Sequence, residues 1–288
     1  AAQALWRSGN VHLQQGDYEA AEAAARQGLA SEPRYSPLLS LLGAILNAQG
    51  RFDEADEAFG QAVDLEVHGT RALNDWGIAL DSRGDWIGAA QKYEAAIERF
   101  SNDPIVMANL ANASRQMGRL DAAADLAQAA ADLQPDAAWP LEVWGDALAA
   151  KRDYEQAIAK YQEALRLQPE AVSLLVKLGD AFWELGRNQE AAQAYEQAVA
   201  RAPDNDYALA SWGWALLSLE RPAEAIEKLS AAISLDSSVL WYHVELAWAQ
   251  IANGDREAAA ETALAAAQID PENEDVKALL QELGLSSP

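Results

Sequence analysis

A 34-residue period runs through eight copies of the sequence without an insertion or a deletion. Counted from Ala2, three positions of this period carry only glycine or alanine. Position 8 holds Gly9, Gly43, Gly77, Ala111, Gly145, Gly179, Gly213 and Ala247. Position 20 is alanine in every copy, from Ala21 to Ala259, and position 27 is Gly28 followed by seven alanines, from Ala62 to Ala266. Such a period predicts similar units stacked on their neighbours, because one short unit cannot bury its own apolar surface.

Each unit is predicted to form two helices. Apolar residues recur with helical spacing at positions 4, 7 and 11, as in Leu39, Leu42 and Leu46. Position 15 is glycine in six copies, where a left-handed backbone can end the first helix, and position 32 is proline in five, beyond the second helix. We expect sixteen such helices and no strand. Arg152 and Glu220 replace the glycine, so their turns should be the most strained or differently closed.

Three junctions lack the proline and are weaker stops, at Val67, Ser101 and Ser237. In the third copy Pro104 stands instead at the start of the following helix, where a missing N–H is tolerated. These junctions are where we expect the period to be least sharply marked.

Composition narrows the possible partners. Acidic residues number 45 against 21 basic ones, and the net charge of −24 opposes the phosphate backbone, so we expect no nucleic acid as partner. No apolar run approaches the roughly 18 residues of a membrane span, and no membrane insertion is expected. The absence of cysteine excludes disulfides and thiolate sites but fits cytoplasm and periplasm alike. Self-association is left open.

No motif for catalysis or cofactor binding is found, so we expect no enzyme activity, no cofactor and no metal site. Of the three histidines, His12 and His243 fall in core columns and His68 in a turn, where it should be solvated. The acidic clusters around Asp204 and Asp270 lack the glycine and glutamate of a calcium loop. They are better explained as negative charge at helix starts.

The pattern of small residues, glycine, proline and an aromatic at position 17 resembles the tetratricopeptide repeat family. The resemblance implies an all-α fold, a right-handed superhelical solenoid of helix-turn-helix repeats with one continuous core. The repeats would occupy 2–35, 36–69, 70–103, 104–137, 138–171, 172–205, 206–239 and 240–273. Within 272–288, Glu272 to Leu283 resembles the family's capping helix, closed by Gly284.

In this family the first helices line a concave groove, and positions 2, 5, 6, 9, 12 and 13 contact the ligand. In repeats five to eight these positions give an aromatic and acidic groove: Trp139, Glu142, Asp146, Asp180, Trp183, Tyr207, Trp214, Trp241 and Trp248, with Glu184 and Glu245 as further acids and Lys177 as the single cation. Exposed rings mark interaction sites, and their faces with nearby carboxylates attract cations. We therefore expect a protein or peptide partner with apolar and basic side chains. The alternative is that the rings pack on one another or on the capping helix.

A secondary groove in repeats one to four carries amides: Asn10, Asn74, Asn109 and Asn112. Amides donate and accept at once and can bond an extended backbone, although isolated solvated asparagines would look the same. Asn10 and Arg71 match two of five positions of the family's clamp for chaperone tails. Trp6, Leu41 and Asp75 occupy the other three, which argues against that clamp.

The sequence therefore predicts a scaffold or adaptor that binds a peptide segment or a partner protein in its groove. Two alternatives stay open: a segment of a larger bacterial envelope assembly or export scaffold, and the substrate-recruiting arm of a catalytic module on another part of a longer protein. The chain starts at Ala1 and its ends coincide with repeat boundaries, so excision from a larger protein is one interpretation. The excess of arginine over lysine favours a bacterial source.

Overall fold

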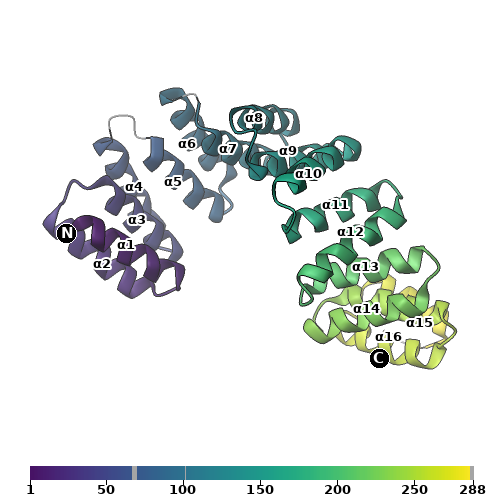
Figure 1. Cartoon of the computed structure of the whole chain (residues 1–288). Coiled ribbons are helices and arrows are strands. Elements are labelled where there is room, and N and C mark those ends of the chain that lie inside the picture. The colour runs from purple at the N-terminus through teal and green to yellow at the C-terminus, as the bar shows by residue number, and fades with distance from the viewer. Residues whose placement is uncertain (67–69, 101, 286–288) are drawn as a thin grey trace. The chain divides into compact units, whose positions relative to one another are not determined.

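A computed structural model describes residues 1–66, 70–100 and 102–285, and every regular element in these ranges is an α-helix (Figure 1). The expected junctions at Val67 and Ser101, and His68, lie outside the described residues. The first helices of the repeats are α1 (Ala2–Gln14), α3 (Ser36–Ala48), α5 (Thr70–Ser82), α7 (Pro104–Gln116), α9 (Ala138–Ala150), α11 (Val172–Glu184), α13 (Asp206–Ser218) and α15 (Leu240–Ala252). The second helices are α2 (Tyr18–Ser31), α4 (Phe52–Leu65), α6 (Trp86–Arg99), α8 (Leu120–Leu133), α10 (Tyr154–Leu167), α12 (Asn188–Arg201), α14 (Pro222–Leu235) and α16 (Arg256–Ile269), followed by α17 (Glu274–Leu283). The expected pairs of helices and the helix start at Pro104 are confirmed.

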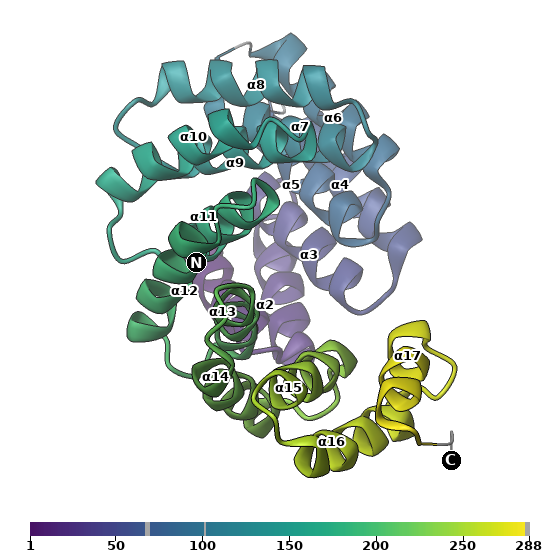
Figure 2. The same ribbon diagram turned by 90° about the vertical axis from the view of Figure 1, so that its right-hand side faces the viewer.

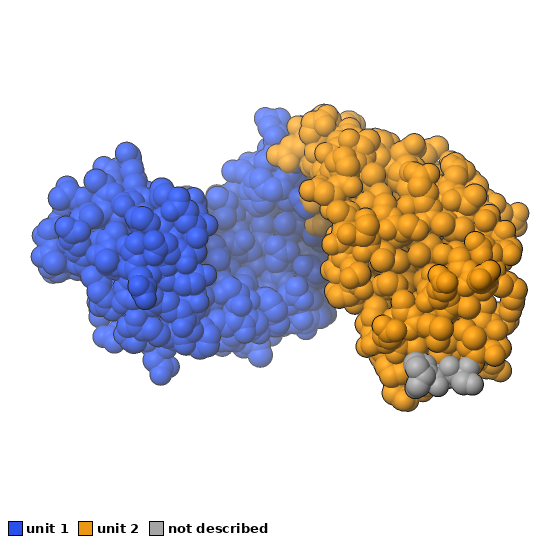
Figure 3. All heavy atoms as spheres, turned by 90° about the horizontal axis from the view of Figure 1, so that it is seen from below, with its two compact units in different colours: residues 1–151 blue, residues 152–288 orange. Residues whose placement is uncertain are grey.

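The chain divides into two compact units, residues 1–151 and 152–288 (Figure 3). Within each unit, a helix packs against the next helix along the chain or the next but one. In unit 2, α11, α13 and α15 follow one another on one side, with α12, α14 and α16 behind them (Figure 2). The fifth repeat gives α9 to unit 1 and α10 to unit 2. One continuous superhelical core through all repeats stays a prediction.

The turns after the first helices are closed by residues with left-handed backbone. The six glycines at position 15 all have positive φ, between 70° and 89°. Arg152 and Glu220 adopt the same conformation, with φ of 62° and 59°, and are the two non-glycine residues with positive φ in the described chain. Because a side chain makes this conformation costly, the expectation that these two turns are the most strained is confirmed.

Small residues at position 8 make room for a large side chain from the second helix. A Cβ added at Gly179 would lie 2.5 Å from the ring of Tyr195, and one at Gly43 would lie 2.8 Å from Phe59. Both rings stand at position 24 of their repeats. Where position 8 is alanine, position 24 is alanine too, in the pairs Ala111 with Ala127 and Ala247 with Ala263. In the second, third and sixth repeats, glycine at position 8 therefore leaves room for the aromatic ring at position 24.

Two tryptophans at position 7 have a structural role, as their core column predicts. Trp76 and Trp212 pack against the core clusters of their units. Each ring is also covered by a lysine of the following second helix, Lys92 at 3.5 Å and Lys228 at 4.5 Å from the ring centroid. The chain thus places its own cations on tryptophan faces.

The last helix closes the core of unit 2 but begins later than expected. It starts at Glu274 rather than Glu272, because the Asn273 side chain accepts hydrogen bonds from the first backbone N–H groups and caps the helix. Gly284 ends it with φ of 70°, as expected. Val276 and Leu279 are fully buried against α15 and α16.

The two histidines of the core columns differ. His243 is buried, and its Nε2 lies 2.9 Å from the carbonyl oxygen of Ser237, so the expectation of a packed imidazole holds there. His12 is only partly buried, with its Nδ1 3.8 Å from Asp17. For His12 the expectation is corrected, because it lies on the last turn of α1 beside the exposed turn residues Gly16 and Asp17.

Candidate partner-binding pockets

Three successive first helices of unit 2 enclose a pocket of about 490 Å³. We call it the aromatic pocket; it is lined by Asp180, Trp183 and Glu184 of α11, Tyr195 of α12, Tyr207, Ser211 and Trp214 of α13, and Trp241 and Glu245 of α15. These side chains come from groove positions of the repeat, apart from Tyr195. Stacking of the helices therefore gathers residues about 30 positions apart in sequence around one cavity.

The rings of the aromatic pocket meet at steep angles. The Trp183 and Trp214 centroids lie 4.0 Å apart with planes tilted by 37°, and those of Trp214 and Trp241 lie 6.5 Å apart with a tilt of 59°. Tyr207 meets Trp241 edge to face at 6.1 Å. Trp214 and Tyr207 remain 36% and 44% exposed, so part of their ring surface is available to a ligand.

Asp180 anchors the phenol side of the pocket. Its Oδ1 accepts hydrogen bonds from the hydroxyls of Tyr195 at 2.7 Å and Tyr207 at 3.2 Å. Burial raises the pKa of Asp180 above its usual value, against the lowering effect of the two phenols. Burial and the neighbouring Asp180 charge raise the pKa of Tyr207 to about 12, so this phenol stays a hydrogen-bond donor.

Glu184 and Glu245 add two further carboxyl groups, and the lining contains no lysine or arginine. Glu184 is exposed, whereas Glu245 is largely buried. Burial, and next the charge of Asp275, raise the pKa of Glu245 to about 7. Near neutral pH the pocket can therefore gain negative charge when a cation enters, because a cation favours the ionised form of Glu245.

Five of the predicted groove residues converge on this pocket: Asp180, Trp183, Tyr207, Trp214 and Trp241. Trp248 does not line it and packs instead on the cluster that contains Val276 and Leu279 of α17. The reason is that α17 packs on α15 and α16 as a further first helix would. The alternative interpretation describes Trp248, which packs on the capping helix, and in part Trp183 and Trp214, whose rings pack on each other.

Trp139, Glu142 and Asp146 lie on α9, which belongs to unit 1. Their part in a groove shared with the aromatic pocket stays a prediction. Sequence reasoning did not assign Tyr195 and Ser211 to the site. Ser211 occupies groove position 6, so the repeat frame could have indicated it, whereas Tyr195 is buried in the core and its hydroxyl donates to Asp180.

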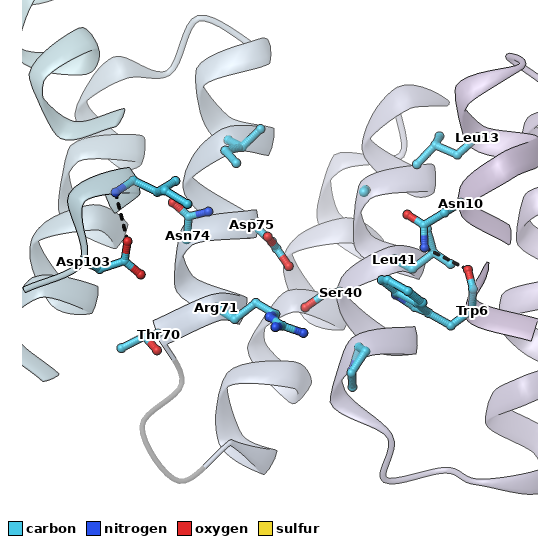
Figure 4. Close-up of a pocket in the computed structure, with 14 residues that line it drawn as sticks. Trp6, Asn10, Leu13, Ser40, Leu41, Thr70, Arg71, Asn74, Asp75 and Asp103 are labelled. Carbon is cyan, nitrogen blue, oxygen red and sulfur yellow. Dashed lines mark hydrogen bonds between the residues drawn. The ribbon is translucent and has the colours of Figure 1, made fainter. Parts of the chain in front are cut away.

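Unit 1 holds a second pocket, of about 700 Å³, lined mainly by first helices α1, α3, α5 and α7 (Figure 4). Asn10 and Asn74 of the predicted secondary groove line it. Asn10 donates to the carbonyl oxygen of Trp6 in its own helix, and Asn109 donates to the Asn74 side chain at 2.9 Å. Asn112 lies on α7 and does not line the pocket. The amides thus meet in one pair rather than a regular row.

The residues at the five clamp positions all line this unit 1 pocket: Trp6, Asn10, Leu41, Arg71 and Asp75. Their side chains differ from those that bind carboxylates in the family's clamp. Arg71 is their single cation, and it extends from α5 toward Ser40, with Asp75 on the same side (Figure 4). Burial raises the pKa of Asp75 to about 6, against the lowering effect of the Arg71 charge. One cation beside one carboxyl group leaves no excess of positive charge for a pair of carboxylates.

The chain belongs to the tetratricopeptide repeat family. Sequence models of this repeat match residues 12–71, 74–138, 143–206 and 216–283. Small glutamine-rich tetratricopeptide repeat-containing protein 2 of Mycosarcoma maydis is 30% identical over 109 residues, which is 38% of this chain and 29% of that protein. The matched segment is thus less than a third of that relative's length.

Solved structures share the fold. A structure titled as YrrB, a TPR protein with an unusual peptide-binding site, has a TM-score of 0.57 and 23% identity, and the match covers 67% of this chain and 99% of that one. The Cut9–Hcn1 hetero-tetramer has a TM-score of 0.67 and 17% identity, with 92% and 52% of the two chains covered. These likenesses establish a solenoid of tetratricopeptide repeats.

Tetratricopeptide repeats generally form scaffolds for protein–protein interaction, typically without enzymatic activity, and they bind protein or peptide partners. In the described part of the chain, no helix combines the length and apolarity needed to cross a membrane. Within the same residues, no group of three or more histidine, aspartate or glutamate side chains is placed to hold a metal ion.

Proposed function

We propose that this protein is an interaction scaffold whose aromatic pocket binds a segment of a partner protein through apolar and basic side chains. The observation that carries the proposal is the convergence of Trp183, Trp214 and Trp241 on one open cavity with three carboxyl groups. Bulky rings that face water from a concave surface are typical of binding hot spots.

The charge of the pocket selects among segments. Asp180, Glu184 and Glu245 line it without a cationic side chain of the chain itself. Burial disfavours the ionised forms of Asp180 and Glu245, and a basic group of the partner would offset this cost. An acidic segment would be repelled by these carboxyl groups and by the chain's net charge of −24.

A library of random peptides selected on the whole protein tests the proposal. We expect enrichment of sequences that combine aromatic or aliphatic residues with arginine or lysine. In Trp214→Ala and Trp241→Ala, the affinity of the selected peptides should fall by about 2 kcal/mol, roughly thirtyfold, as for central anchors. Circular dichroism confirms that the variants remain helical.

Trp6→Ala is the matched control, because Trp6 lines the unit 1 pocket. Its affinity for the selected peptides should equal that of the unmodified protein. Peptides that bind both aromatic-pocket variants unchanged, or a selection that enriches acidic segments, would refute the proposed function.

A further inference from the structure

Aromatic faces elsewhere in the chain already carry a cation of the chain. Lys92 covers Trp76, Lys228 covers Trp212, and the Arg187 guanidinium lies 4.6 Å from the ring centroid of Phe182. Among the residues that the structure describes, no lysine or arginine lies over the three tryptophans of the aromatic pocket. Lys177 acts electrostatically on Asp180 but does not line the pocket, so a cation for these ring faces would come from a partner.

The arrangement of the rings indicates the shape of that cation. Trp183 and Trp214 pack on each other at 4.0 Å, whereas Trp214 and Tyr207 are inclined to Trp241 by 59° and 72°, so the last three rings form walls rather than a parallel slot. A flat guanidinium stacks best on parallel faces and seeks a bidentate carboxylate. A rounded cation can touch several inclined faces at once, within the ~6 Å range of a cation–π contact.

The hydrogen-bonding capacity of the pocket points the same way. Of the three lining carboxyl groups, Asp180 already accepts two phenol hydroxyls at its Oδ1, Glu245 is partly buried, and Glu184 is exposed. A lysine ammonium is strongly hydrated and carries three N–H donors that must find new acceptors inside the pocket. An alkylated ammonium has a positive charge without those donors, so it needs the field of the carboxyl groups but few hydrogen bonds.

We propose that the aromatic pocket binds an alkylated ammonium group, the head of a trimethyllysine side chain in the partner segment. This inference rests on the proposed function and names the ligand class of the same site. A choline headgroup has the same cation but carries a phosphate beside it. The three lining carboxyl groups would repel that phosphate and no lining cation would receive it, so the structure favours a protein-borne ligand.

Three short peptides that differ in one side chain test this inference on the whole protein. The first contains trimethyllysine, the second contains unmodified lysine, and the third contains the neutral isostere with a tert-butyl carbon in place of the nitrogen. Each peptide is titrated into the protein while the NMR signals of the indole N–H groups are recorded. Binding should shift the signals of Trp183, Trp214 and Trp241. We expect the trimethyllysine peptide to bind at least about tenfold tighter than the isostere, which isolates the cation–π contribution. It should also bind more tightly than the lysine peptide.

Variants locate the binding. Trp214→Leu and Trp241→Leu keep apolar bulk but remove the aromatic face, and should weaken trimethyllysine binding by about tenfold or more. Trp241→Phe should restore part of the affinity, because phenylalanine keeps a π face. Trp6→Leu, in unit 1, should bind the peptide as the unmodified protein does. Circular dichroism again checks the helices.

The outcomes separate this inference from the proposed function. Equal binding of trimethyllysine and its neutral isostere, tighter binding of lysine, or unchanged binding in Trp241→Leu would overturn the alkylammonium assignment. Binding of phosphatidylcholine vesicles in place of the peptide would overturn the choice of a protein-borne ligand. In each case peptides selected from the random library could still bind through the aromatic pocket. The scaffold proposal would then be supported even though the alkylammonium assignment fails.

Discussion

Arg152 and Glu220 hold a backbone conformation that costs an L-residue about 1–2 kcal/mol. In the other six repeats the corresponding turn residue is glycine, which adopts this conformation freely. We expect Arg152→Gly and Glu220→Gly each to raise the free energy of unfolding by about 0.5–1 kcal/mol, because relief of strain exceeds the added entropy of the unfolded chain. Urea denaturation measures the change.

Gly118 provides the reverse test. Its φ is 73°, and a Cβ added there would meet no atom within 4 Å. Gly118→Ala should therefore destabilise by about 1 kcal/mol through backbone strain alone. A stabilised Gly118→Ala variant, or no gain in either glycine variant, would show that the positive φ carries no cost in this turn.

Glu245 should make stability depend on pH. Its pKa is about 7 in the folded protein against 4.5 for an ordinary glutamate, so the folded state binds more protons between these values. The free energy of unfolding therefore falls as pH rises from 4.5 to 7. Glu245→Gln should remove this contribution and stabilise the protein by about 1–3 kcal/mol at pH 8, with little effect at pH 4.

The matched control is Glu184→Gln, because Glu184 lines the same pocket but is exposed. Its denaturation midpoints at pH 4 and pH 8 should both stay close to those of the unmodified protein. A Glu245→Gln variant that gains no more stability at pH 8 than at pH 4 would contradict the burial of this carboxyl group.

At the scale of helices, the contact between positions 8 and 24 predicts a coupling. Gly179→Ala should drive a Cβ into the Tyr195 ring and destabilise the protein despite the better helix propensity of alanine. Tyr195→Ala should also destabilise, by about 3–5 kcal/mol as for a large aromatic side chain. The destabilisation of the double variant should be about 1–2 kcal/mol smaller than the sum of the two single-variant destabilisations. The reason is that the Cβ added at Gly179 no longer meets the Tyr195 ring.

The repeats with alanine at both positions, such as Ala111 with Ala127, are the natural counterpart of that double variant. The coupling energy is obtained from thermal and urea denaturation of four proteins: the unmodified protein, the two single variants and the double variant. Strictly additive destabilisations would mean that the small residue at Gly179 is not required by the Tyr195 ring.

The repeat frame predicted the helices well because each signal in it is local. Turn glycines and helical spacing depend on residues within one unit, and both are found where the frame places them. The aromatic pocket depends on contacts between repeats. The frame named Trp214, Trp241 and Trp248 alike as groove residues and left packing on the capping helix as an alternative for all of them, because only the contacts of α17 show that it applies to Trp248. The hydroxyl of Tyr195 was missed because its ring belongs to the core.

At the scale of the whole molecule, stability should be local, because helices contact only close neighbours along the chain. Leu279 is fully buried between α17 and its neighbours, and Leu38 is fully buried in unit 1. Leu279→Ala should cost about 2–5 kcal/mol and accelerate amide hydrogen exchange in α15, α16 and α17. Leu38→Ala should do the same in the helices around α3.

Each of these variants serves as the control for the other. Exchange in unit 1 should be unchanged in Leu279→Ala, and exchange in α15 to α17 should be unchanged in Leu38→Ala. Faster exchange throughout the chain in either variant would show that the protein unfolds as a single cooperative body.

The restriction of contacts to near neighbours also matters while the protein is being made. The core cluster between Ala2 and Ala79 draws on the first five helices alone. A nascent chain can therefore close this cluster while its later repeats are still being translated, since translation proceeds from the N-terminus at about 5–20 residues per second. We expect only the newest repeat to expose its alanine and leucine surface at each stage, because the earlier repeats already have their neighbours.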